Sequence, residues 1–309
     1  VVKRAEFKQA AVSSAHPLAS MVGAAIMKKG GNAFDAAIAT QLVLAVVFPN
    51  AGNIGGGGFL LARKTNGELI GIDYREAAPE KSSRDMYLDK SGNAQLNLSQ
   101  HGHLASGIPG TIAGLFASHA YAKLPFNELI QPAIDIAAKG FVLTEKEAAS
   151  INGIKESIEK LSTQPTAFFK TTRWRVGDTL IQKDLANTLE RIQKEGAIGF
   201  YGGKTADLIV AEMERGKGII SHSDLKNYTA KLREPIVFNY RNHEIVSFAP
   251  PSSGGILLAQ MMKMIEKYPV GKMKFQTPES VQLMIEAERR AFADRAEHMG
   301  DPDFWKVPV

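Results

Sequence analysis

Residues 51–79 read AGNIGGGGFLLARKTNGELIGIDYREAAP, and this stretch decides which kind of fold to expect. Four consecutive glycines, Gly55–Gly58, lead directly into an apolar run, residues 59–63, that is typical of a strand. Asn66-Gly67 is a strong signal for a tight hairpin turn, so residues 68–75 are predicted to return as the antiparallel partner. The stretch therefore predicts a β-hairpin that begins at a glycine run and ends at an arginine.

That arginine, Arg75, closes the predicted return strand and lies close to acidic residues in the sequence. Because side chains alternate between the two faces of a strand, Asp73 and Arg75 are expected on one face. The opposite face carries Ile70, Ile72 and Tyr74. On this pattern alone, an arginine is more commonly the ion-pair partner of a nearby carboxylate than a ligand-binding residue. The pattern leaves both roles open for Arg75.

Two helices are predicted before the hairpin. The first covers residues 17–29 and ends at Gly30-Gly31, and the second covers residues 33–47 with Asn32 as its N-cap. The second helix is apolar on nearly every face, which is typical of a helix that is buried inside a layered domain. We therefore expect this helix to lie within the core.

The rest of the chain is predicted to be mostly helical. Residues 109–216 form helices separated by glycines, and strand character returns over residues 234–248 with a turn at Arg241-Asn242. Two further helices are predicted over residues 254–267 and 278–300. Strands near both ends with helices between them predict an α+β fold.

The chain contains no internal repeat and no linker-like tract, so residues 1–309 are expected to form a single domain. Its composition, 44% hydrophobic and 22% charged, is sufficient for a substantial core. The net charge of +5 is spread along the chain, and neither a basic tract nor a long apolar run predicts binding to nucleic acid or to a membrane. The absence of cysteine excludes disulfides and thiolate catalysis and is compatible with export.

The common catalytic patterns are absent from the sequence. Ser252-Ser253 lacks the preceding glycine of a nucleophile elbow, and the segment Gly203–Thr205 lacks the first glycine of a phosphate-binding loop. His101 and His103 have no third ligand nearby and are interpreted as polar surface residues, so no metal or cofactor is expected. Val1 has neither a hydroxyl nor a thiol and cannot be an N-terminal nucleophile.

Six blocks of sequence, taken in order, resemble the large subunit of the γ-glutamyltranspeptidase (glutathione hydrolase) family in its bacterial form. The likeness runs from about residue 11 to residue 304, and any one block alone would be weak evidence. The blocks are GGNAFDAA at 30–37, AGNIGGGGF at 51–59, DYREAAP at 73–79, GIPGT at 107–111, PPSSGG at 250–255 and ADR at 293–295.

The resemblance implies an Ntn-hydrolase αββα sandwich that is completed by a separate small subunit. In this family one precursor cuts itself in two, and the threonine exposed at the start of the small subunit is the nucleophile. We therefore expect no catalytic residue on this chain and a heterodimer as the active form. The sequence is interpreted as a trimmed large subunit that lacks its C-terminal end, from a periplasmic or secreted enzyme.

The resemblance also implies a role for Arg75, because the family's Asp-Tyr-Arg-Glu motif binds the α-carboxylate of the γ-glutamyl donor, glutathione for example. A planar guanidinium can hold a carboxylate through two parallel hydrogen bonds, which lysine cannot. Gly55–Gly58 are expected near the floor of the active site, and Ser252-Ser253 are expected to cap the next helix. A glutaryl or cephalosporin acylase and an inactive binding relative remain alternative functions.

Overall fold

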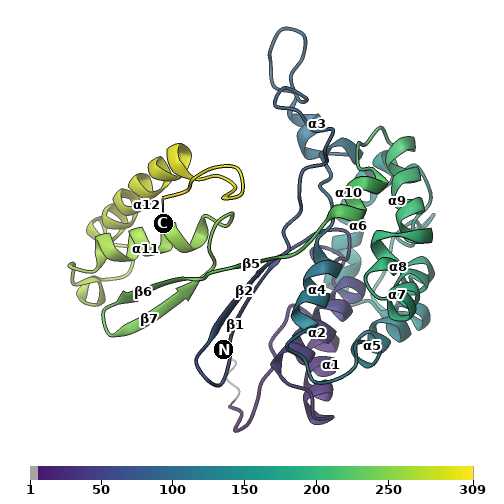
Figure 1. The fold of residues 1–309 in the computed structure, drawn as a ribbon, viewed down its shortest axis with the longest axis horizontal. Helices are drawn as coiled ribbons and strands as arrows, with labels where there is room; N and C mark the ends of the chain where they lie inside the picture. Colours follow the sequence, from purple (N-terminus) through teal and green to yellow (C-terminus); the bar gives the residue numbers. More distant parts are fainter. Residues whose placement is uncertain (1–5, 309) are drawn as a thin grey trace. The chain divides into compact units, whose positions relative to one another are not determined.

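The computed structural model describes residues 6–308, which form two compact units (Figure 1). Unit 1 consists of residues 6–58 and 74–230, and unit 2 consists of residues 59–73 and 231–308. Each unit is discontinuous in sequence, because the hairpin at 59–73 interrupts unit 1 and belongs to unit 2. Whether residues 1–309 behave as a single domain stays a prediction.

Unit 1 is built around α2 (Ala33–Val47), which packs beside α1 (Pro17–Lys28). α2 has the predicted bounds, and ten of its fifteen residues are buried, while Ala33 and Ala37 are exposed. The Asn32 side chain accepts hydrogen bonds from the backbone of Phe34 and Asp35, while the Asp35 carboxylate accepts one from the Asn32 amide at 2.7 Å. This capping box confirms the predicted start of the helix.

The other helices of unit 1 confirm the prediction for residues 109–216, and the core forms where α2, α5 and α7 pack together. The short strands β3 (Phe141–Val142) and β4 (Thr179–Leu180) pair with each other in this region and were not predicted. The helices are α3 (Leu96–Gln100), η1 (His103–Ala105), α4 (Thr111–His119), α5 (Phe126–Lys139), α6 (Glu145–Leu161), α7 (Lys183–Glu195), α8 (Ile198–Tyr201), α9 (Gly203–Arg215) and α10 (His222–Asn227).

One partly exposed charge network ties the segment that carries η1 to α9. His103 Nε2 lies 2.8 Å from Oε1 of Glu212, whose Oε2 accepts hydrogen bonds from Thr163 Oγ1 and Arg215 Nη2, both at 2.6 Å. His103 is therefore largely buried and paired, in contrast to the surface position predicted for it, whereas His101 is exposed. Burial alone would raise the pKa of Glu212, but these hydrogen bonds outweigh it and lower the pKa to about 2.

Replacing Glu212 with glutamine is expected to destabilise the protein by about 1–3 kcal/mol at pH 7, because three donors lose their charged acceptor. The pKa of this carboxylate is depressed in the folded state, so its contribution is complete above the unfolded value of about 4.3 and is lost as the pH falls toward about 2. Urea unfolding at pH 7, 5 and 3 measures the free energy of unfolding. The difference in this free energy between wild type and Glu212→Gln should shrink only below pH 5. Glu214→Gln changes an exposed residue of the same helix and is the control. An equal loss of stability in both variants would contradict the stabilising role of the Glu212 network.

Unit 2 contains the predicted hairpin, β1 (Phe59–Arg63) and β2 (Leu69–Asp73), in which Phe59 pairs with Asp73. β5 (Lys231–Arg233) adds to the other edge of β2. A second predicted hairpin and two predicted helices complete the unit, and the helices lie side by side in Figure 1. These elements are β6 (Ile236–Tyr240), β7 (His243–Ser247), α11 (Gly254–Ile265), η2 (Val270–Lys272) and α12 (Pro278–His298).

The prediction that the return strand ends at Arg75 was wrong, because β2 ends at Asp73. Gly58 and Tyr74 still exchange two backbone hydrogen bonds, of 3.1 and 3.2 Å, but the chain then leaves the hairpin ladder. Ala77 instead exchanges backbone hydrogen bonds with Ile108. The pairing partner of the segment thus changes within three residues, and Arg75 lies between the two pairings.

Candidate functional site

The segment Tyr74–Glu76 lies in unit 1 between two glycine-rich segments, 55–58 and 107–114. A β-carbon on Gly57 would come within 2.9 Å of the Cα atom of Arg75, and one on Gly110 would overlap the carbonyl oxygen of Tyr74. Side chains at these two positions would therefore push the Arg75 backbone away. Three of the six blocks that carry the family resemblance meet at this point.

The two glycine-rich segments are also bonded to each other. The carbonyl oxygen of Gly56 accepts hydrogen bonds from the amides of Gly110, at 2.7 Å, and Thr111, at 3.0 Å. The Tyr74 ring packs on Gly114, and its hydroxyl donates to Oε1 of Gln41 on α2 at 3.2 Å. Burial raises the pKa of the Tyr74 hydroxyl, so it stays a protonated donor at neutral pH. The backbone on both sides of Tyr74 is thus fixed to the core of unit 1.

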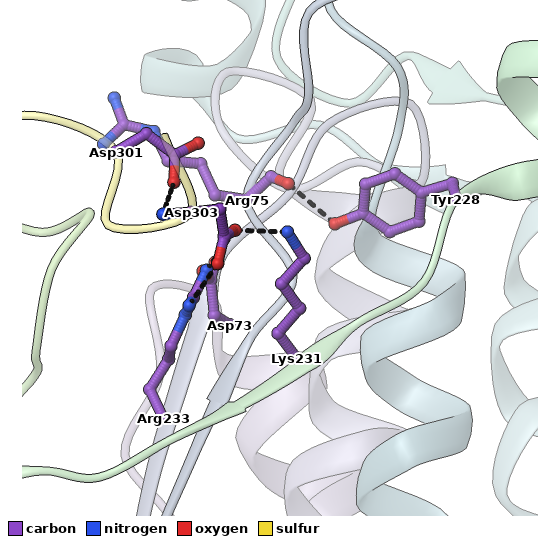
Figure 2. Close-up of polar contacts among 7 residues, drawn as sticks. All are labelled: Asp73, Arg75, Tyr228, Lys231, Arg233, Asp301 and Asp303. Atoms are coloured by element: carbon purple, nitrogen blue, oxygen red, sulfur yellow. Dashed lines mark hydrogen bonds and ion pairs between the residues drawn. The ribbon is translucent and has the colours of Figure 1, made fainter. Parts of the chain in front are cut away.

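Arg75 follows this fixed residue and differs from it in exposure, since Tyr74 is buried and the Arg75 side chain is exposed. Its backbone carbonyl oxygen accepts a hydrogen bond from the hydroxyl of Tyr228 at 2.6 Å (Figure 2). A charged side chain on a firmly held backbone suits recognition of an anionic group, because the backbone loses little conformational freedom when the group binds.

Asp73, the first residue of the same motif, has a structural role within unit 2. Its carboxylate is buried and accepts a hydrogen bond from Arg233 Nε at 3.1 Å. Arg233 in turn donates two hydrogen bonds of 2.8 Å to Asp303, which also pairs with Lys231 (Figure 2). The hydrogen bonds from Arg233 and Lys231 lower the pKa of the Asp303 carboxyl. This network joins the end of β2, β5 and the segment that follows α12.

Ser252 and Ser253 lie at the start of α11, where a capping role was predicted. Ser253 occupies the N-cap position, but its side chain makes no capping hydrogen bond. Its Oγ instead accepts a hydrogen bond from Arg295 Nε of α12 at 3.1 Å, and only Ser252 Oγ accepts one from the Gly254 amide, at 3.4 Å. The capping prediction is therefore wrong for the Ser253 side chain, which joins two helices of unit 2.

A cavity of about 600 Å³ opens in unit 1 beside the first glycine-rich segment. Its walls come largely from residues 11–15 and α2. Most lining residues are apolar, and the polar ones are Ser13, Ser14, Thr40, Gln41, Asn53 and Thr111. The predicted place of Gly55–Gly58 at an active-site floor stays a prediction. Within residues 6–308, no group of three or more His, Asp or Glu side chains is placed to hold a metal ion.

Comparison with known proteins identifies the family. The model of the family described as gamma-glutamyltranspeptidase matches residues 19–309, which is most of the chain. The chain belongs to the γ-glutamyltranspeptidase family. All six blocks that carry the resemblance lie within the matched residues.

Individual relatives, both curated proteins and a solved structure, support the same assignment. The glutathione hydrolase proenzyme of Escherichia coli strain K12 is 43% identical over 97% of this chain and 52% of its own length. The crystal structure of Helicobacter pylori γ-glutamyltranspeptidase superposes with a TM-score of 0.96 at 42% identity, over 99% of this chain and 88% of that chain. The acylase ACY 1 proenzyme of Pseudomonas sp. strain V22 is 38% identical over 95% of this chain and 54% of its own length.

These similarities confirm the fold predicted for a γ-glutamyltranspeptidase large subunit, the mixed α and β architecture of the Ntn hydrolases. The chain spans about half the length of the curated relatives it matches. Sequence patterns located Arg75, but not Tyr228, Arg233 or Asp303. These three residues are separated from their partners by 70–160 positions, and no local pattern links such distant residues.

Proposed function

We propose that this chain is the large subunit of a γ-glutamyltranspeptidase that cleaves the γ-glutamyl bond of glutathione and related donors. The γ-glutamyl group is then passed to water or to an amino acid or peptide. The position of Arg75, an exposed residue on a backbone held between two glycine-rich segments, is the observation that carries this proposal. Membership of the family supports it.

Arg75 binds the α-carboxylate of the donor in this proposal. The guanidinium fork donates two parallel hydrogen bonds to the carboxylate, which fixes both the position and the direction of the γ-glutamyl group. The scissile amide lies at the other end of this group, so Arg75 contributes by orientation and does not touch the bond that breaks.

The nucleophile is the threonine at the start of the small subunit, so this chain has no catalytic residue of its own. The threonine hydroxyl attacks the γ-carbonyl carbon while its own α-amine takes the hydroxyl proton. The C–N bond breaks, the leaving amine receives the proton, and an ester to the threonine remains. Water or an acceptor amine then attacks this ester, which releases the γ-glutamyl group and restores the threonine hydroxyl.

The partner in this proposal is the small subunit cut from the same precursor. The curated relatives are named proenzymes and are about twice as long as this chain, which supports such a partner. Unit 2 also exposes an apolar face of α12, and exposed apolar patches of this kind mark surfaces that bind another protein chain. Three residues of this face are more than half exposed, namely Met284, Ile285 and Phe292.

We further propose that the enzyme is periplasmic or secreted. The chain has no cysteine, so it could not form mispaired disulfides in an oxidising compartment. None of the helices formed by residues 6–308 is both long and apolar enough to cross a membrane.

The proposed function predicts that the processed full-length protein hydrolyses γ-glutamyl-p-nitroanilide at least about 10-fold more efficiently than glutaryl-p-nitroanilide. The glutaryl compound keeps the carboxylate but lacks the α-amine, so it is the donor that a glutaryl acylase would prefer. Release of p-nitroaniline gives kcat/KM for both compounds. A preference for the glutaryl donor would support the acylase alternative, and turnover of neither would support an inactive binding relative.

A further inference from the structure

Tyr228, which follows α10, makes a contact that the family motif does not predict. Its hydroxyl donates a hydrogen bond of 2.6 Å to the backbone carbonyl oxygen of Arg75, and both residues belong to unit 1. Figure 2 shows the ring approaching the Arg75 backbone, away from the guanidinium. Arg75 lies two residues beyond the end of β2.

The Tyr228 ring is itself held in place. It stacks on the Tyr201 ring, with centroids 5.9 Å apart and planes inclined by 10°. The Tyr201 hydroxyl donates to the carbonyl of Pro109 at 2.8 Å and accepts from the Ala113 amide at 3.2 Å, which fixes this second ring to the segment around α4. A β-carbon on Gly110 would overlap the Tyr228 hydroxyl, so the glycine at this position keeps the path to Arg75 open.

A second contact from α10 holds the chain after Arg75. The carboxylate of Asp224, one turn before Tyr228, accepts a hydrogen bond from the Glu80 amide at 2.8 Å. Asp224 is buried and also completes the capping box of α10 with Ser221. α10 and the residue that follows it therefore hold this part of the chain at two points, the carbonyl of Arg75 in the motif and the amide of Glu80 just after it.

We propose that Tyr228 is a positioning residue for donor binding, which sets the direction of the Arg75 guanidinium by fixing the carbonyl of the same residue. This inference rests on the proposed function. A backbone carbonyl that is held from one side restricts rotation of the peptide unit, and the Cα–Cβ direction of Arg75 is restricted with it. The aromatic stack makes this restraint rigid, because a tyrosine ring has few rotatable bonds.

Tyr228→Phe in the processed full-length protein tests the proposal, because phenylalanine keeps the stack on Tyr201 and removes only the hydroxyl. Loss of one hydrogen bond to a backbone carbonyl is expected to raise KM for γ-glutamyl-p-nitroanilide about 3- to 10-fold, with kcat changed less than about 2-fold. KM for 4-aminobutanoyl-p-nitroanilide, which keeps the amine but lacks the α-carboxylate, should stay unchanged. Tyr228→Phe should also add little to the effect of Arg75→Lys, because the two residues act on one contact.

Tyr87→Phe is the matched control, because the Tyr87 hydroxyl donates to the carbonyl of Leu104 at 3.0 Å elsewhere in unit 1. This variant loses the same type of bond and should keep the wild-type KM. Two results would overturn the positioning role of Tyr228 and leave the proposed function intact. One is equal kinetics for Tyr228→Phe and Tyr87→Phe, and the other is an equal rise of the KM of Tyr228→Phe for the γ-glutamyl and the 4-aminobutanoyl compound. A wild-type protein without γ-glutamyl turnover would overturn the proposed function and this inference with it.

Discussion

Replacing Arg75 with lysine is expected to raise KM for γ-glutamyl donors about 10- to 150-fold, while cleavage of the precursor stays close to that of wild type. Lysine keeps the charge but loses the fork, so the α-carboxylate receives one hydrogen bond where it received two. Steady-state kinetics with γ-glutamyl-p-nitroanilide measure the first effect, and the ratio of precursor to subunits on a denaturing gel measures the second.

Two controls make the Arg75 result specific. 4-Aminobutanoyl-p-nitroanilide lacks the α-carboxylate, so its KM should be the same for wild type and Arg75→Lys. Arg84→Lys changes a nearly fully exposed arginine of unit 1 that pairs with Asp85, and this variant should behave like wild type with both donors. An unchanged KM of Arg75→Lys for the γ-glutamyl donor would remove Arg75 from the donor site.

The chain of 309 residues, produced alone, is expected to be inert toward γ-glutamyl-p-nitroanilide, with kcat/KM lower than that of the processed full-length protein by a factor of about 1000 or more. The physical reason is that Arg75 can orient a donor, but the attacking threonine belongs to the other subunit. Production of the chain together with the rest of the precursor is expected to restore turnover.

Assembly has to be measured beside activity in this experiment. Size-exclusion chromatography shows whether the two chains form a heterodimer, and circular dichroism shows whether the chain alone retains its helices. Turnover by the isolated, folded chain would contradict the division of the active site between subunits. A heterodimer that forms but has no activity, beside an active full-length protein, would contradict the expected complementation.

Much of the fold could be predicted because the determining signals are local. The bounds of α2 follow from a cap and a long apolar run, and the first hairpin follows from the turn Asn66-Gly67. The predicted strand end at Arg75 was wrong because the chain after Tyr74 changes partner, and Ala77 pairs with Ile108, more than 30 residues away. A strand end of this kind has no marker in the strand's own sequence.

The candidate site shows the same limit more clearly. The pattern around Arg75 left an ion pair and a ligand-binding role open, and only the resemblance to a family favoured the second. In the structure, Asp73 pairs with Arg233 and the carbonyl of Arg75 bonds to Tyr228, more than 150 residues later in the chain. Such contacts depend on how distant segments pack, and alternation along one strand does not encode them.

The hairpin at 59–73 has a consequence for the order in which the protein folds. Gly58 and Tyr74 exchange backbone hydrogen bonds at its base, so the formed hairpin brings together the two parts of unit 1 that it interrupts. Closure of a short hairpin is fast and costs little loop entropy compared with contacts across long segments. We infer that the hairpin of unit 2 brings the two parts of unit 1 together early in folding. The folding rate of unit 1 therefore depends on residues 59–73, which belong to unit 2.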